Sequence, residues 1–141
     1  MQVRARVGGE NGIEDIASAL AIAGIPCTPQ QPADCPGLPE VIQDLQADSL
    51  HQECRELGVL AGFFHEAGGV LKIPEDSVRY DGEAATTRDG DALIVIKELI
   101  FEQGLLKKLV VHEAAHHKGY EHCEVDPQAP ISIEDLERLC R

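Results

Sequence analysis

Basic residues are scarce in this chain of 141 residues, in which 12 lysines and arginines face 25 aspartates and glutamates. The formal net charge is -13 with histidine taken as neutral. Proteins that bind nucleic acid usually do so through clustered lysine and arginine, which neutralise the phosphates. The composition therefore argues against an extended nucleic-acid surface, although it leaves room for a local basic patch.

Long apolar runs are also missing. The longest nearly apolar stretch, residues 16–27, is well short of the ~20 residues that span a bilayer. Arg4 and Arg6 precede it, as in a signal peptide, but Asn11 and Glu14 form the pattern of a helix N-terminus directly before the run. We therefore expect no membrane segment and interpret the stretch as part of an ordinary helix.

No C-x-x-C pair occurs among the five cysteines, which are Cys27, Cys35, Cys54, Cys123 and Cys140. An odd number of cysteines without a paired motif favours a reduced, cytoplasmic protein over a secreted disulfide framework. The alternative is a single disulfide such as Cys27–Cys35, because that spacing would allow a closed loop.

The residues that are present are typical of one globular domain. Hydrophobic residues make up 43% of the chain and charged residues 26%, which is ordinary for a folded protein in water. The length suits one hydrophobic core and is too short for two. We find no internal repeat, so the sequence predicts a single domain over residues 1–141.

Helical periodicity dominates the first half of the chain. Apolar residues recur at helical spacing over residues 13–23 and again over residues 39–57, where Gly58 suits the end of the helix. The proline-rich residues 26–39 between them predict a loop. Residues 59–64 are apolar enough for either a strand or a further helical turn, and periodicity leaves both open.

The second half alternates short strands with helices. The strands are predicted at residues 69–73, 77–80 and 92–96, and the last of these is apolar on both faces, as in the most buried strand of a sheet. Helices are predicted at residues 97–103, with a bend near Gly104, at residues 105–118 and at residues 133–140. These elements predict an α+β fold with a small mixed sheet.

The chemistry-bearing segment is residues 112–122, which reads H-E-A-A-H-H-K-G-Y-E-H and matches H-E-x-x-H-x-x-G-x-x-H at every specified position. On a helix, His112 and His116 differ by only about 40° around the axis, so both rings can reach one metal ion. Gly119 supplies a left-handed turn that ends the helix and lets His122 close the site. Three histidines with an open fourth position predict a catalytic Zn²⁺ site.

Glu113 is the predicted general base. It lies about 60° around the helix from His116, at the edge of the ligand face, where a carboxylate can hold a water molecule without being a ligand. His117 points away from the other two rings and is interpreted as a surface residue.

Other candidates carry weaker signals. His65-Glu66 resembles half of the zinc motif, but Gly69 occupies the position of the second histidine, and His51 lies in an acidic helix. Four further side chains could donate a hydrogen bond to an oxyanion that develops near the metal. The alternative for each of them is an ordinary surface residue. These donors are Arg79, Tyr80, Arg88 and Tyr120.

The segment from His112 to His122 resembles the extended zinc motif of metzincin-type metallopeptidases. The resemblance implies that zinc is bound by His112, His116 and His122, that Glu113 is the base, and that a peptide or protein is the substrate. It also implies a compact zincin-like domain with an active-site helix at residues 105–118. The family's Met-turn has no counterpart, since Met1 is the only methionine.

A second resemblance is to the YbeY-type rRNA-processing endoribonucleases. Their three-histidine segment ends in G-Y-D-H, which is close to residues 119–122. In that family a Gly-Asp pair and a short apolar strand come before this segment, and here Gly90 and Asp91 precede an apolar strand in the same way. It implies zinc-dependent RNA cleavage with a basic patch beside the metal, although that family normally lacks a glutamate at the position of Glu113. A third interpretation is a non-catalytic module whose zinc is closed by Cys123 or Asp126.

The metallopeptidase is the preferred hypothesis, and the endoribonuclease ranks second. The sequence thus predicts a cytoplasmic zinc hydrolase with no membrane partner.

Overall fold

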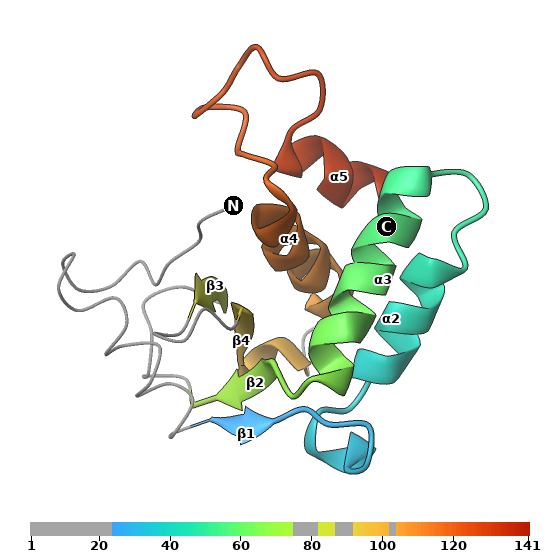
Figure 1. Cartoon of the computed structure of the whole chain (residues 1–141), viewed down its shortest axis with the longest axis vertical. Helices are drawn as coiled ribbons and strands as arrows, with labels where there is room; N and C mark the ends of the chain where they lie inside the picture. Colours follow the sequence, from blue (N-terminus) through green and yellow to red (C-terminus); the bar gives the residue numbers. More distant parts are fainter. Residues whose placement is uncertain (1–23, 75–81, 87–91, 102–103) are drawn as a thin grey trace, which may run out of the picture.

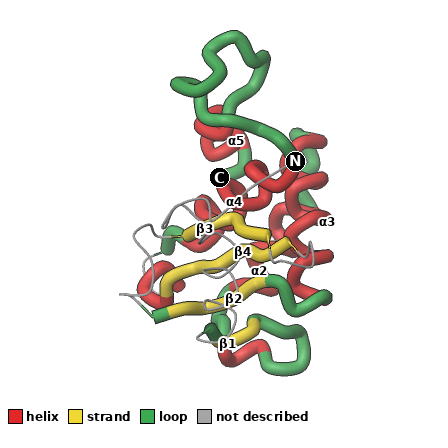
Figure 2. The backbone as a smooth tube through the Cα atoms, turned by 60° about the vertical axis from the view of Figure 1, so that its left-hand side comes forward, coloured by secondary structure: helices red, strands yellow, loops and turns green. Residues whose placement is uncertain are grey.

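The computed structural model describes residues 24–74, 82–86, 92–101 and 104–141. Within this part of the chain a four-stranded mixed sheet has the strand order β1-β2-β4-β3, and the helices gather on one side of it (Figures 1 and 2). The predicted α+β fold with a small mixed sheet is therefore confirmed.

Two central strands form the middle of the sheet. β2 (Val70–Ile73) and β4 (Ala92–Lys97) run parallel to each other, while β1 (Ile25–Pro26) and β3 (Gly82–Thr86) pair antiparallel at the two edges. Residues 93–96 of β4 are all buried, as expected for a central strand that is apolar on both faces. The predicted strand at residues 77–80 lies outside the described residues, and β3 forms where no strand was predicted.

Among the described residues, four α-helices pack beside the sheet. They are α2 (Leu38–Gln46), α3 (Gln52–Glu66), α4 (Leu106–Lys118) and α5 (Ile133–Leu139), with short 3₁₀ helices at η2 (Pro32–Asp34) and η3 (Glu98–Phe101). The four helices and the strand β4 all contribute fully buried side chains to one hydrophobic core, among them Leu45, Leu57, Ile96, Val111 and Leu136. The helix predicted at residues 13–23 lies outside the described residues.

The prediction of one helix over residues 39–57 is wrong, because α2 and α3 are separate helices. The Asp48 carboxylate accepts the N–H groups of Leu50 and His51, which turns the chain between them. The second helix then continues to Glu66, so residues 59–64 are helical.

Gly58 lies inside α3, where a Cβ atom would come within 2.7 Å of the Gln46 nitrogen and the Leu45 Cβ on α2. Gly58 therefore does not end the helix; it lets α3 pack closely against α2.

The later helices follow the prediction more closely. α4 begins one residue after the predicted start, and Gly104 has φ +71, in the left-handed region, just before it. α5 starts at a capping box in which Ser132 and Asp135 bond each other's backbone N–H groups. The predicted helix at residues 97–103 is described only as the 3₁₀ turn η3.

The expectation of reduced cysteines is wrong for four of the five. Cys27 bonds Cys35 beside β1, and Cys54 at the start of α3 bonds Cys140 at the C-terminal cap of α5. The second pair is separated by 86 positions, and only the fold brings the two residues together. Cys123 is a free, exposed thiol. In the described segments, we find no helix with the length and hydrophobicity that a bilayer crossing requires.

Candidate metal centre

Helix α4 positions the first two histidines of the site. Its apolar residues, including Val110, Val111 and Ala114, are buried in the core and fix the rotation of the helix. His112 and His116 lie one turn apart, with His112 partly exposed and His116 buried. The predicted helical spacing therefore places both rings on one side of α4.

The turn at Gly119 brings in the third histidine. Gly119 ends α4 with φ 103, a conformation that residues with a Cβ rarely adopt. The N–H of Tyr120 then bonds the Ala115 carbonyl at 3.0 Å, which closes the helix end and turns the chain back toward the first two histidines. His122 follows this turn and is partly exposed.

The three imidazole rings form a nearly equilateral triangle. The ring centroids are 5.0 Å apart for His112–His116, 4.8 Å for His112–His122 and 4.9 Å for His116–His122. Imidazoles that share one tetrahedral zinc at about 2.0–2.1 Å have centroids about 5 Å apart. Their ligand atoms lie within 4.8 Å of one another, so the three histidines are close enough to hold one metal ion.

Two glutamates of α5 orient two of these rings. Nδ1 of His112 bonds Glu137 Oε2 at 2.7 Å, and Nδ1 of His122 bonds Glu134 Oε2 at 2.6 Å. Because an ionised carboxylate only accepts hydrogen bonds, the Nδ1 atoms carry the protons and the Nε2 atoms are left for a metal. The sequence prediction missed both glutamates. Their spacing of three on a helix was the only signal, and it requires knowledge that α5 packs against α4.

Glu134 also holds the chain segment after the third histidine. Its Oε1 accepts the N–H of Cys123 at 2.9 Å. Burial alone would raise the pKa of Glu134, but its hydrogen bonds with His122 and with the Cys123 N–H lower this pKa to about 2. Glu134 is therefore a carboxylate at neutral pH, as the bond to Nδ1 of His122 requires.

Among the described residues, no carboxylate or thiol joins the three histidines in the metal-binding group. Cys123 and Asp126, the predicted ligands of a closed structural site, are exposed and lie outside it. Desolvation and the nearby Glu134 carboxylate raise the pKa of the Cys123 thiol, which makes it a poorer ligand. In the part of the chain that the structure describes, the candidate metal-binding group therefore consists of three histidines alone.

Glu113 lies on α4 next to His112, and its side chain is only 4% exposed. It does not belong to the group of candidate ligand atoms. Charged residues are seldom buried to this extent without a specific reason.

The other histidines have structural contacts. His117 Nε2 donates to the Leu93 carbonyl at 2.8 Å and its ring meets Phe64 edge-on, and desolvation lowers its pKa. His65 Nδ1 donates to the Cys27 carbonyl at 2.6 Å in the core. His51 is the N-terminal cap residue of α3. None of them joins the metal-binding group.

The predicted oxyanion donors are only partly described. Tyr120 is half-buried and packs against the hydrophobic core. Arg79, Tyr80 and Arg88 lie outside the described residues.

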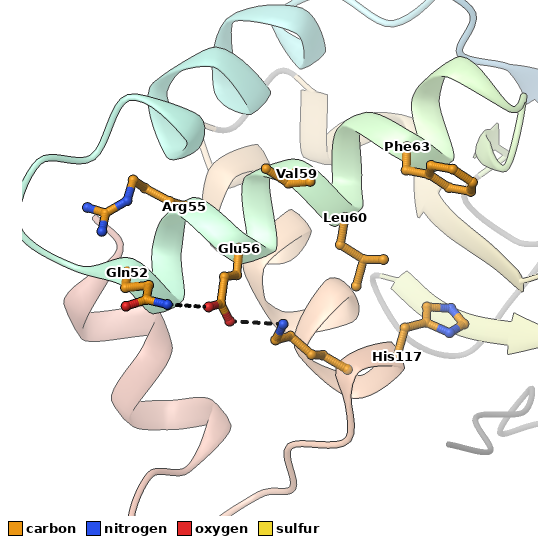
Figure 3. Close-up of a pocket in the computed structure, with 8 residues that line it drawn as sticks. Gln52, Arg55, Glu56, Val59, Leu60, Phe63 and His117 are labelled. Atoms are coloured by element: carbon orange, nitrogen blue, oxygen red, sulfur yellow. Dashed lines mark hydrogen bonds and ion pairs between the residues drawn. The ribbon is translucent and has the colours of Figure 1, made fainter.

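A separate groove lies between α3 and the end of α4 (Figure 3). Its apolar part is formed by Val59, Leu60 and Phe63, and His117 and an ion pair between Glu56 and Lys118 at 2.9 Å border it. None of the three candidate ligands lines this groove.

The fold and the site together define an α+β protein with a three-histidine candidate metal centre. Comparison with protein-family models, with curated proteins and with solved structures gave no match. The functional argument therefore depends on the chemistry of the site.

Proposed function

We propose that this protein is a zinc-dependent metallopeptidase with a zincin-like domain. The observation that carries the proposal is the triangle of His112, His116 and His122, two of whose Nδ1 atoms are bonded to carboxylates. Such a carboxylate–histidine pair fixes the ring and strengthens the nitrogen that faces the metal. Three nitrogen ligands with a free fourth position are the donor set of catalytic zinc.

Zinc bound here would act as a Lewis acid that polarises a carbonyl group and acidifies water. The chain's own contribution to the chemistry is Glu113, which accepts the proton of the attacking water and passes it to the leaving amine. Because its side chain is 4% exposed, bulk water competes little for this carboxylate.

Two features favour a peptide over RNA as the substrate. Glu134 and Glu137 place negative charge directly behind the ligands, which disfavours the approach of a phosphodiester. In addition, β3 is at the edge of the sheet that the described residues form and packs beside α4, and an edge strand can align an extended peptide through main-chain hydrogen bonds.

The experiment compares the zinc-loaded protein with its Glu113→Gln variant on unstructured peptides and, separately, on structured RNA. The variant should keep its zinc, because Glu113 is not a ligand, and should cleave peptides about 10²–10⁴-fold more slowly. Glu124→Gln, which changes an exposed carboxylate in the following loop, is the matched control.

Each outcome decides between functions. RNA cleavage that depends on Glu113 would favour the endoribonuclease, and unchanged peptide cleavage in Glu113→Gln would remove this residue from the mechanism. Absence of any cleavage by the zinc-loaded parent would contradict a hydrolase and favour a binding module.

A further inference from the structure

We infer that the disulfide between Cys54 and Cys140 positions the metal centre, so that its reduction lowers the affinity for zinc. The inference depends on the proposed zinc site and adds a form of regulation to it. It begins with α5, the helix that carries both Glu134 and Glu137. Two of the three ligands are therefore oriented only when α5 is held against α4.

Helix α5 is attached at both ends. At its N-terminus, the Ile133 N–H bonds the Glu121 carbonyl at 3.0 Å, beside the capping box of Ser132. At its C-terminus, Cys140 is bonded to Cys54 of α3. Seven residues are too few for a helix to be stable without tertiary support, so these attachments determine where α5 lies.

The two glutamates differ in how much they depend on the disulfide. Glu134 also holds the Cys123 N–H and lies in the first turn of the helix, next to the capping box. Glu137 lies one turn before Cys140 and bonds His112. Loss of the disulfide should therefore displace Glu137 more than Glu134 and disturb His112 more than His122.

Apolar packing should limit how far α5 moves when the disulfide is reduced, so that zinc affinity falls but is not lost. Ile133 and Leu136 are fully buried and continue to hold α5 on the core when the disulfide is open. Reduction then loosens the last turn of the helix without detaching it. Outer-shell partners of a metal site contribute about 10–100-fold to metal affinity, which sets the size of the expected change.

The reaction is an ordinary thiol–disulfide exchange. A dithiol transfers two electrons and two protons, the Cys54–Cys140 bond breaks to give two thiols, and the dithiol becomes a disulfide. Since Cys54 is 0% and Cys140 2% exposed, the reductant reaches them only when the end of α5 opens. Bound zinc opposes this opening, so zinc should also protect the disulfide, by the reciprocity of linked equilibria.

The second disulfide provides a matched control. Cys27 and Cys35 are 0% and 2% exposed, the same burial as the first pair. In Figure 1, β1, which directly precedes Cys27, lies at the bottom of the molecule, and α5 lies in its upper half. Its removal should change zinc affinity by less than about threefold, well below the range for outer-shell partners.

The first experiment measures the zinc dissociation constant by competition with a chromophoric chelator. It compares the parent, the double variant Cys54→Ala/Cys140→Ala and the double variant Cys27→Ala/Cys35→Ala, with folding checked by circular dichroism. We expect a loss of about 10–100-fold for the first variant only. Equal affinity in all three proteins, or equal losses in both variants, would overturn the inference.

The second experiment needs no variant and applies if the first double variant does not fold. The parent is treated with a water-soluble phosphine, which reduces each disulfide to two thiols and becomes its oxide with oxygen from water. Opening of each disulfide is followed by mass spectrometry. Saturating zinc should slow the loss of Cys54–Cys140 at least tenfold and leave Cys27–Cys35 unchanged.

The outcomes separate the two proposals. Equal reduction rates with and without zinc, in a parent that binds zinc, would overturn the disulfide link while the zinc site stands. A parent that binds no zinc would overturn both. Peptide cleavage that persists in the parent, with no redox effect on affinity, would leave only the proposed function.

Discussion

His122 is the candidate ligand that a helix alone cannot supply. His112 and His116 share a face of α4 because of the helical period, whereas His122 depends on the left-handed turn at Gly119 and on the bond from its Nδ1 to Glu134. The affinity of the centre should therefore be sensitive to His122 and insensitive to the neighbouring His117, which bonds the Leu93 carbonyl.

The first prediction at the residue scale concerns these two histidines. His122→Ala should weaken zinc binding by more than about 100-fold, because even an outer-shell partner contributes about 10–100-fold. His117→Ala should leave zinc affinity nearly unchanged and lower only the stability. Isothermal titration with zinc checks both. A larger loss of affinity in His117→Ala than in His122→Ala would mean that the ligand set is wrong.

The second prediction concerns Glu137, which we regard as a positioning residue. Glu137→Gln keeps an oxygen that can accept the Nδ1 proton, so zinc affinity should fall less than in Glu137→Ala, where the fall should be about 10–100-fold. The d–d spectrum of the cobalt-substituted protein would report the change in ligand geometry. If Glu137→Gln and Glu137→Ala lose the same zinc affinity, the hydrogen bond is not what orients His112. The same conclusion follows if the exposed control Glu124→Gln loses as much affinity.

Much of the candidate site could be predicted because its residues are close together in the sequence. The three histidines and the buried Glu113 lie within one helix and the turn after it, where spacing translates directly into geometry. Glu134 and Glu137 could not be found in this way. Their role depends on the packing of α5 against α4, and no local pattern records that contact.

At the scale of the elements, α3 shows where periodicity reaches its limit. The apolar positions of α2 and α3 follow one helical pattern, so the break at Asp48 is invisible to it, and Gly58 suggests an end where the helix continues. The cause is the close approach of α2, which a glycine permits and which local sequence does not report. The strand β4 was predictable because its residues 93–96 are buried on both faces of the sheet, which leaves a continuous apolar run in the sequence.

The third prediction tests this packing. Gly58→Ala should lower the free energy of unfolding by about 1–3 kcal/mol, because its Cβ would meet the backbone of α2 at 2.7 Å. Gly62→Ala on the same helix would meet mainly the end of the Gln46 side chain, which can move. Its cost should therefore be smaller than that of Gly58→Ala, or it should be stabilising. Urea unfolding of both variants makes the comparison, and a larger loss in Gly62→Ala would contradict the packing argument.

At the scale of the whole molecule, the candidate metal centre is assembled from two consecutive helices, one of which is bonded to a distant part of the chain. The ligands come from α4 and the turn that follows it, their carboxylate partners come from α5, and α5 is in turn bonded to α3 through Cys54–Cys140. Metal binding should therefore stabilise the packing of α4, α5 and α3 as a unit. The disulfides were the part of this assembly that the cysteine count predicted wrongly, since two pairs and a free thiol also make an odd number.

The fourth prediction follows from this assembly. A ligand that binds only the folded state stabilises it by about 2.7 kcal/mol at 100 times its dissociation constant. Zinc at that level should therefore raise the Tm by about 5–10 °C over the chelator-treated protein. Differential scanning calorimetry gives the shift, and His122→Ala is the control that should not show it. An identical Tm with zinc and with chelator in the parent would argue against the centre.

The hydrogen bond between the Glu121 carbonyl and the Ile133 N–H closes the base of the segment between the third histidine and α5. Residues 123–128 above this base are exposed and project from the molecule (Figure 1). Because the base holds His122 and Glu134 together, the length of the segment is not set by the centre, and insertions there should be tolerated. Evolutionary variation should therefore preserve the spacing within residues 112–122 and between the two glutamates, while the distance between these two signatures drifts freely.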